Sequence, residues 1–289
     1  MSLGPIACVT VSAPDLDAVE AAYTRWLGYQ VRDRTTVSDD AAAVWGAPAA
    51  AGAGMLLMGP HTGEDVFLRF VEGPAVDGYA PLMTHGWHAT EIVVADVDGL
   101  EGRLAGSPFA IIGPPADLSI TDKVRAMQVT GPAGEVLYLT QVKEPVPGFD
   151  LPQAGDGVER VFIVVAGGPD LGALRDFYGR ALGLSSSEPA GAVVSVLSDA
   201  HGLPAEALHD LSIVQLDGAC LVELDQFPAS ARDRPVADGA LPPGMAMVSL
   251  LTDDLGGRDA RALAGHVYGG RRACVCRGGA GELIELIER

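Results

Sequence analysis

The chain has 289 residues, of which 48% are hydrophobic, and its formal net charge is −19. This length predicts about two domains, and the strong negative charge argues against nucleic-acid and anionic-membrane partners. The sequence shows neither an apolar run long enough to span a bilayer nor a secretory signal pattern, so we expect a cytoplasmic protein.

One short pattern occurs four times, beginning near Cys8, Ala89, Arg160 and Met247. Each copy is an apolar, strand-like run followed by an Asp-containing turn and a helix pattern. A unit of this size cannot bury its own apolar face. We therefore expect the copies to pair and to form concave cups in which a ligand can bind.

In the first unit a strand is predicted from Ile6 to Ser12, followed by a helix that Asp15 caps and that Gly28 ends. Residues 74–81 are predicted to form a linker. Further strands are expected at 42–45, 54–58 and 66–71. The second unit predicts a helix over 97–104 and strands at 125–129 and 136–142.

The third unit predicts a helix over 171–182 that ends at Gly183. Its strands are expected at 192–197, 211–216 and 220–225, and those of the fourth unit at 272–276 and 282–287. The segment 143–152 contains three prolines and is the best domain boundary. We therefore predict two domains, 1–145 and 155–289, each made of two βαβββ units.

Four cysteines occur in apolar surroundings, and none of them forms a CxxC pair. This arrangement favours buried free thiols in a reducing compartment over disulfides or a zinc site. The four cysteines are Cys8, Cys220, Cys274 and Cys276.

Two kinds of motif repeat in the units. The helices contain Ala22-Tyr23-Thr-Arg-Trp-Leu-Gly28 and Phe177-Tyr178-Gly-Arg-Ala-Leu-Gly183, and the closing strands contain Gly131-Pro-Ala-Gly-Glu-Val-Leu-Tyr138-Leu and Gly278-Gly-Ala-Gly-Glu-Leu-Ile-Glu285-Leu. These segments resemble the Phe-Tyr…Leu-Gly and closing Gly…Glu-Leu motifs of the vicinal oxygen chelate superfamily, which includes glyoxalases, bleomycin-resistance proteins and extradiol dioxygenases. The resemblance implies an α+β fold, with four βαβββ modules that pair into two curved mixed sheets, each forming a cup with helices outside.

The resemblance also implies metal ligands, namely a His early in a module's first strand and a Glu in its last strand. In this chain the first-strand positions fall on Cys8, on Ala89 with His88 one residue earlier, near Arg160 and near Met247. The last-strand positions fall near Arg69 and on Tyr138, Glu223 and Glu285. Because the imidazoles are replaced, we expect no cofactor and no metal site of the usual type. A hard divalent ion held by Glu223 and Glu285 remains as an alternative.

The candidate catalytic residues are Glu285, Glu223, Glu91 and Tyr138. Either of the first two glutamates is an acid, base or ligand aimed into a cup, or else part of a solvated strand face. Glu91 interrupts an apolar strand, where an unpaired carboxylate is costly to bury, so it is a candidate base. Tyr138 is a hydrogen-bond donor to a substrate oxygen or an aromatic core filler. The candidate ligand-binding residues are Cys8, His88, Trp87, Arg160 and Met247.

These residues predict a protein that acts on small molecules, as a glyoxalase-like isomerase or lyase that uses general acid–base catalysis on an oxygenated substrate. A binding protein of the bleomycin-resistance kind is the alternative, and the missing imidazoles favour it. A metal-dependent extradiol dioxygenase is a third possibility that requires a ligand set the sequence does not supply. The partner is expected to be a small-molecule ligand, and the protein a monomer or a homodimer.

Overall fold

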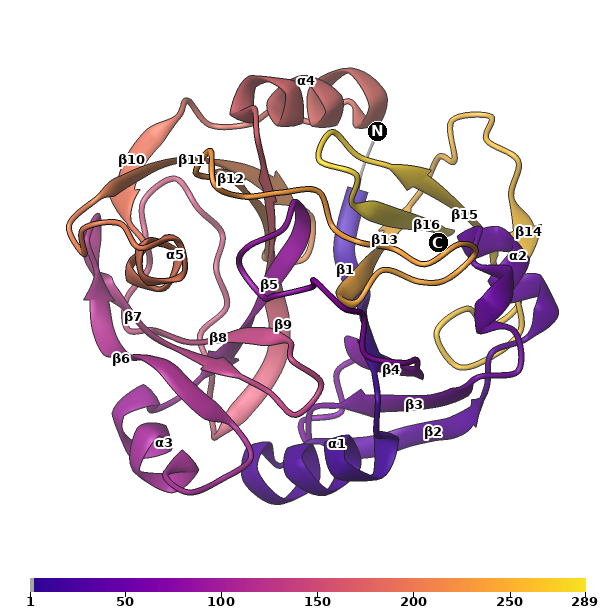
Figure 1. Cartoon of the computed structure of the whole chain (residues 1–289), viewed down its shortest axis with the longest axis horizontal. Helices are drawn as coiled ribbons and strands as arrows, with labels where there is room; N and C mark the ends of the chain where they lie inside the picture. Colours follow the sequence, from indigo (N-terminus) through magenta and orange to yellow (C-terminus); the bar gives the residue numbers. More distant parts are fainter. Residues whose placement is uncertain (1–2) are drawn as a thin grey trace.

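The computed structural model describes residues 3–289, which form an α+β fold of four βαβββ-like modules (Figure 1). Module 1 contains β1 (Leu3–Ala13), α1 (Leu16–Ala22), η1 (Tyr23–Leu27), β2 (Gln30–Thr36), α2 (Asp39–Trp45), η2 (Pro48–Ala50), β3 (Gly54–Gly59) and β4 (Phe67–Glu72). Module 2 contains β5 (Gly86–Val94), α3 (Val97–Leu104), β6 (Ala110–Leu118), β7 (Thr121–Thr130) and β8 (Val136–Val142). Module 3 contains β9 (Val158–Gly168), α4 (Leu171–Leu182), β10 (Ala190–Val193), α5 (Ser195–His201), β11 (Leu208–Leu216) and β12 (Cys220–Gln226). Module 4 contains β13 (Gly244–Thr252), β14 (Arg261–Ala262), β15 (Arg272–Arg277) and β16 (Leu283–Glu288).

The strands form two mixed sheets of eight strands each. The first has the order β14-β15-β16-β13-β1-β4-β3-β2 and the second the order β10-β11-β12-β9-β5-β8-β7-β6. Modules 1 and 4 therefore share one sheet, joined by the antiparallel pair β1 and β13, while modules 2 and 3 share the other, joined by β5 and β9. The fold class expected from the sequence is confirmed.

The pairing of modules differs from the expected one, in which the halves 1–145 and 155–289 each build their own cup. That pairing is wrong, because each sheet combines one module from either half. The proline-rich segment marks a connection between modules 2 and 3, both of which belong to the second sheet. Turn and linker residues in the sequence show where the chain turns. They do not show which modules pair, because the first strand of every module offers a similar edge for pairing.

The helices of the first three modules begin at the residues predicted for them. Asp15, Asp96 and Asp170 each accept a hydrogen bond from the backbone N–H three residues later, which stabilises the first helical turn. Module 4 differs, because no helix follows β13 among the described residues. Gly256 and Gly257 adopt positive φ values of 62° and 69° at this place, so the chain turns where a helix was expected.

Two short helices replace strands that were predicted at 42–45 and 192–197. The first is α2, which the Ser38 side chain caps and which ends at the left-handed Gly46. The second is α5, which follows the short strand β10 and ends at the left-handed Gly202. Short apolar runs do not by themselves distinguish a strand from a buried helical turn, and these predictions were wrong for that reason.

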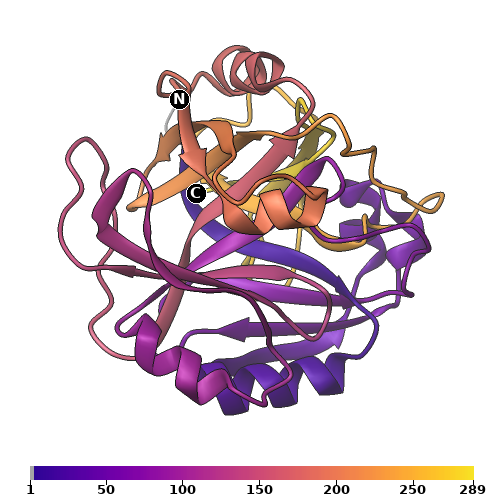
Figure 2. The same cartoon turned by 60° about the vertical axis from the view of Figure 1, so that its left-hand side comes forward.

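The core has a shared part and two separate parts. A shared cluster on the convex side contains residues of all four modules, including the helix residues Val19, Leu100 and Leu174. Helices α1 and α3 run side by side along one edge of the molecule and α4 lies at the opposite edge (Figure 2). Each concave face has its own apolar cluster, to which α2 contributes in the first sheet and α5 in the second.

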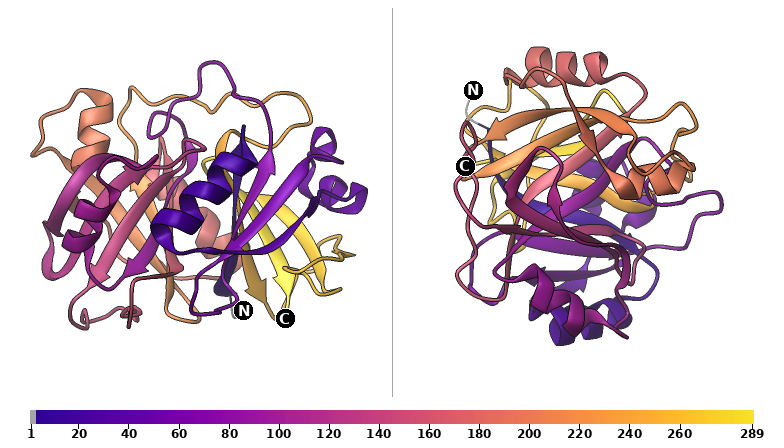
Figure 3. Two further views of the ribbon diagram at one scale, coloured as in Figure 1. Left: turned by 90° about the horizontal axis from the view of Figure 1, so that it is seen from below. Right: turned by 90° about the vertical axis from the view of Figure 1, so that its left-hand side faces the viewer.

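The two ends of the described chain lie close together (Figure 3). The Arg289 guanidinium donates a hydrogen bond to the Gly4 carbonyl, which joins the last strand to the first. No helix among residues 3–289 has the length and apolar character needed to cross a membrane.

Candidate functional site

Strand register identifies four equivalent pairs of side chains at the centres of the two sheets. In each module the residue five positions before the Asp that follows the first strand pairs with a residue of the last strand. The pairs are Thr10 with Arg69, Glu91 with Tyr138, Val165 with Glu223, and Ser249 with Glu285. The sequence had placed the first-strand positions on Cys8, on Ala89, near Arg160 and near Met247, and the register moves all four.

The cup of modules 1 and 4, which we call the closed cup, is filled by the protein itself. Arg69 and Glu285 form an ion pair across its centre, with 3.1 Å between Nη2 and Oε2, and their side chains are 1% and 0% exposed. Arg69 also donates to the Thr10 hydroxyl at 2.9 Å. The Ser249 hydroxyl donates to Glu285. The four central positions of this cup thus satisfy one another.

Two aromatic residues seal the closed cup. The Trp45 indole N–H donates to Glu285 Oε1 at 2.8 Å, and the Tyr268 hydroxyl donates to the same oxygen at 2.7 Å. The Arg69 guanidinium lies over the Trp45 ring, 4.5 Å from its centroid. Although burial lowers the pKa of Arg69, the surrounding Tyr268, Cys8 and Glu285 raise it above its ordinary value, so the guanidinium stays charged. The carboxylate of Glu285 is therefore occupied by the chain.

Cys8 and Met247 both belong to this sealed cluster and are completely buried. Burial raises the pKa of the Cys8 thiol to about 12, so the free thiol keeps its proton near neutral pH. Neither side chain is accessible to a ligand in this arrangement.

The cup of modules 2 and 3, which we call the open cup, contains a cavity of about 200 Å³. Its walls are mostly apolar, with Val124, Phe162, Leu211 and other side chains from all eight strands of the second sheet, and α5 contributes Val196. Glu91, Tyr138, Thr140 and Glu223 all line this cavity. Three of the four predicted catalytic residues thus meet in one pocket, and Glu285 is excluded from it.

Glu91 is a strongly perturbed acid of the open cup. Burial and the neighbouring Glu223 raise its pKa from 4.5 to about 8, although a hydrogen bond from the Thr140 hydroxyl to Oε2, 2.7 Å long, opposes the shift. A carboxyl group with a pKa in this range exchanges protons readily near neutral pH.

Glu223 and Asp225 lie two residues apart on β12, so both face the same side of the sheet. Burial and the neighbouring Asp225 raise the pKa of Glu223 well above its ordinary value, and burial also raises that of Asp225. His88 lies behind them, with Nε2 3.2 Å from Asp225 Oδ2. Burial and the nearby Arg234 lower the pKa of His88 to about 3, so this imidazole is neutral.

Two predicted ligand-binding residues lie outside both cups. Trp87 faces the convex core, where its indole N–H donates to the Leu283 carbonyl at 2.7 Å. Arg160 lies near the start of β9, where it pairs with Glu64 at 3.2 Å and donates to the Gly218 carbonyl at 2.9 Å. Strand alternation and strand position therefore direct Trp87 and Arg160 away from both cups, where the sequence analysis had expected them.

The central residues of both cups differ from the ligand set that the resemblance implies. The closed cup has one carboxylate, and a guanidinium occupies its centre. In the open cup the four central positions are Glu91, Tyr138, Val165 and Glu223, and residues 3–289 hold no group of three metal-ligating side chains suited to an ion. Glu223 and Glu285 lie in different sheets, so they cannot hold one ion together as the alternative had supposed.

Thr140 and Asp225 are site residues that the sequence reasoning missed. Each lies two residues beyond a candidate, Tyr138 and Glu223 respectively, on the same strand. Because side chains alternate across a strand, that spacing places both on the concave face and could have identified them.

No family model and no curated protein matches the sequence. Solved structures do match. Glyoxalase I from Zea mays has a TM-score of 0.67 at 15% identity, over 99% of this chain and 92% of that chain. A putative dioxygenase from Bacillus subtilis has a TM-score of 0.61 at 13% identity, over 99% of this chain and 86% of that one. At these identities the likeness concerns the fold, and the chain has the fold of the vicinal oxygen chelate superfamily.

Proposed function

We propose that the protein acts on a small oxygenated organic molecule in the open cup, as an isomerase or lyase that uses acid–base catalysis without the usual His/His/Glu metal site. The observation that carries the proposal is the convergence of Glu91, Tyr138 and Glu223 in one apolar cavity. Perturbed acids in a cavity are candidates for proton transfer, because burial adjusts their pKa toward the working pH.

Glu91 is the proposed base. With a pKa of about 8 it takes a proton from carbon next to a carbonyl and returns it at a neighbouring position. Thr140 holds its Oε2 atom by a 2.7 Å hydrogen bond and so fixes the direction of the carboxyl group. Tyr138 pairs with Glu91 across β5 and β8, and it is the proposed hydrogen-bond donor to the substrate oxygen.

Burial holds the pKa of Tyr138 well above its ordinary value, and the three nearby carboxyl groups raise it further. The phenol therefore keeps its proton, as a donor to a developing negative charge must do. Apolar walls exclude water from the reacting atoms and bind the substrate body by burial of apolar surface.

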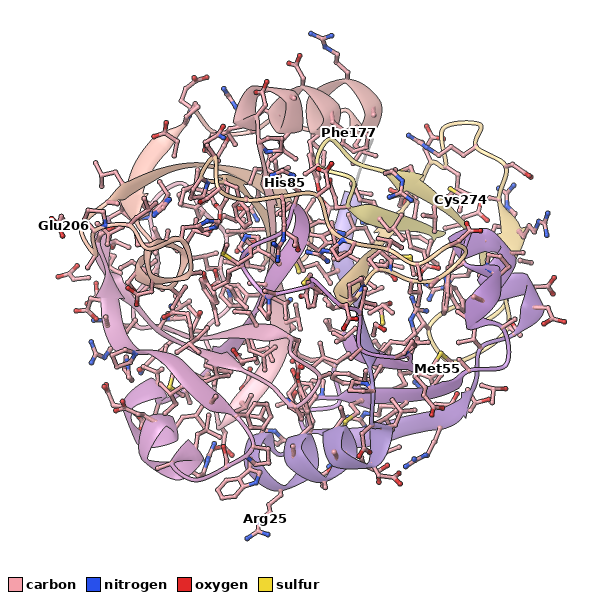
Figure 4. All side chains as sticks on the ribbon, viewed as in Figure 1. Arg25, Met55, His85, Phe177, Glu206 and Cys274 are labelled. Carbon is pink, nitrogen blue, oxygen red and sulfur yellow. The ribbon has the colours of Figure 1, made fainter. Side chains whose placement is uncertain are left out.

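The proposal is tested by proton exchange on a probe ketone. We expect the protein to exchange the α-hydrogens of 4-phenylbutan-2-one in D2O, followed by NMR, with a rate that rises as Glu91 ionises toward pH 8. Glu91→Gln should remove this exchange, whereas Glu206→Gln, at the edge of the molecule in Figure 4, should preserve it. Exchange that persists in Glu91→Gln would exclude Glu91 as the base.

A binding protein of the bleomycin-resistance kind is the second candidate. The observation that favours it is the absence of a three-ligand metal group among residues 3–289, since sequestration requires only a cavity. Saturable binding of the ketone without any exchange, unaffected by EDTA, would support this candidate over an isomerase or lyase.

A further inference from the structure

The charged residues that line the open cup are all acidic. They are Glu91 and Glu223 on the inner wall and Asp117 at the outer end. Asp117 already has cations, because Lys143 lies 2.9 Å and Arg125 3.4 Å from its Oδ1 atom. Glu91 and Glu223 have no such partner among the residues of the cavity wall, which include no Lys, Arg or His.

The closed cup shows how the same arrangement looks when it is complete. Glu285 occupies the position that Glu223 has in the open cup, and Arg69 occupies that of Tyr138. In the closed cup the chain supplies a guanidinium to the buried carboxylate, and aromatic rings enclose that cation. In the open cup the carboxyl group is retained, the cation is missing, and the cavity takes its place.

We infer that the open cup binds a small organic cation, an oxygenated molecule that carries an amine or quaternary ammonium group on an apolar body, and whose charged group lies between Glu223 and Glu91. This inference names the substrate class of the site proposed above and rests on that proposal. The apolar body would contact Phe149, Phe162 and the aliphatic walls, and the cation would occupy the place that the guanidinium of Arg69 has in the other cup.

The surrounding strands supply no competing charge. Facing the bound cation are Glu91 of β5, Tyr138 of β8 and Glu223 of β12, while β9 contributes the apolar Ile163. Asp225 of β12 lies outside the cavity wall and acts on Glu223, whose pKa it raises. His88 of β5 stands behind Asp225 and is neutral, because burial and Arg234 lower its pKa to about 3. A cation placed here would stabilise the ionised form of the acids.

Binding therefore has a proton consequence. Before binding, burial favours the protonated forms of Glu91 and Glu223, and a neighbouring acid raises each pKa further, Glu223 that of Glu91 and Asp225 that of Glu223. When an ammonium group enters, a carboxyl group releases its proton to the solvent and pairs with the ligand. An amine ligand keeps its own proton. The pocket therefore gains one negative charge while the ligand brings one positive charge.

Three probes that share one body test the inference, namely 4-phenylbutylamine, 4-phenylbutan-1-ol and 4-phenylbutanoate. Isothermal titration calorimetry at pH 7, in phosphate and in Tris, measures affinity and proton release together. We expect the amine to bind about tenfold or more tightly than the alcohol and the carboxylate to bind most weakly. The apparent enthalpy of amine binding should differ between buffers, which reports the released proton.

Variants locate the effect. Glu223→Gln should reduce the preference for the amine over the alcohol to about threefold or less, on the scale where tenfold is about 1.4 kcal/mol. It should leave alcohol binding nearly unchanged, which also shows that the variant is folded. Glu206→Gln is the matched control, since its exposed loop lies outside the cavity wall, and the preference should stay.

The outcomes separate this inference from the proposed function. Equal or tighter binding of the alcohol or the carboxylate would overturn the inference and leave the site intact. Failure of all three probes to bind would overturn the site and the inference together. Competition by MgCl2 against the amine, abolished by EDTA, would assign the cation position to a metal ion and would also overturn the inference.

Discussion

Glu91 and Arg69 are both ionisable residues in apolar strands, and their surroundings give them opposite roles. Arg69 is matched by Glu285 and by three hydroxyl groups, so it completes a closed network. Glu91 has one hydrogen bond, from Thr140, and faces a cavity. Removing one partner of a buried ion pair leaves an uncompensated charge. Burying a lone carboxyl raises its pKa. Both effects are measurable.

Stability should depend on pH through Glu91. Its pKa is 4.5 when exposed and about 8 in the fold, so between these values the unfolded chain loses a proton that the folded one keeps. This contribution is fully present below pH 4.5 and is lost as the pH rises through about 8, by up to about 1.4 kcal/mol per pH unit. Urea denaturation from pH 5 to 9 should show a shallower decline for Glu91→Gln than for the wild type. Parallel curves would contradict the buried position of this acid.

Breaking the ion pair of the closed cup should be costly. Arg69→Met leaves Glu285 buried and uncompensated, and we expect a loss of about 3–5 kcal/mol in the free energy of unfolding. The double variant Arg69→Met with Glu285→Met should recover part of that loss, because no charge remains. Arg272→Met, which removes an exposed partner of Glu288, is the control and should leave the urea midpoint nearly unchanged. An equally small effect of Arg69→Met would show that water reaches the closed cup.

At the scale of single elements, local signals determine where helices begin and end. Asp15, Asp96 and Asp170 cap helices in three modules, and left-handed glycines end α4, α2 and α5. Asp254 has the equivalent position in module 4 and accepts a hydrogen bond from the backbone N–H of Gly256 at 2.7 Å, but no helix follows it in the described part of the chain. A cap stabilises a helix only when the following residues can adopt one, and two consecutive glycines oppose this.

The caps should therefore differ in their contribution to stability. Asp170→Ala removes the acceptor of the Ala173 N–H at the start of the 12-residue helix α4 and should cost about 1 kcal/mol. Asp254→Ala should cost clearly less, since it affects one turn. Urea denaturation of the two variants under identical conditions compares them. A larger loss for Asp254→Ala would indicate a structural role for that turn beyond the bond described.

At the scale of the whole molecule, the halves of the chain are interleaved. Each sheet draws one module from residues before the 143–152 segment and one from residues after it, and the convex core includes all four modules. The closed cup is held by its own ion pair, while the open cup keeps a cavity. The chain's own side chains thus fill one cup, whereas the other contains a cavity.

This topology predicts how fragments behave. A fragment of residues 1–148 lacks β13 and β9, the partners of β1 and β5, and we expect it not to fold as a monomer. Coexpression with residues 149–289 should restore both sheets, and a tag on one fragment should then retain the other. Size-exclusion chromatography and circular dichroism check both points. A monomeric 1–148 fragment with cooperative unfolding would show that the predicted domain 1–145 is autonomous.

The sequence by itself determined the fourfold repeat, most helix and strand positions and the α+β class, because caps, turns and apolar periodicity act over a few residues. It also identified Glu91, because an ionisable group in an apolar strand is locally visible, and it identified Tyr138 and Glu223 as the last-strand positions that the family resemblance implies. Only the tertiary structure decided that these three share one cavity and that Glu285 is neutralised by Arg69, 216 residues away in the chain. Pairing between strand edges is a long-range choice among similar partners, and the register that results selects which side chains meet.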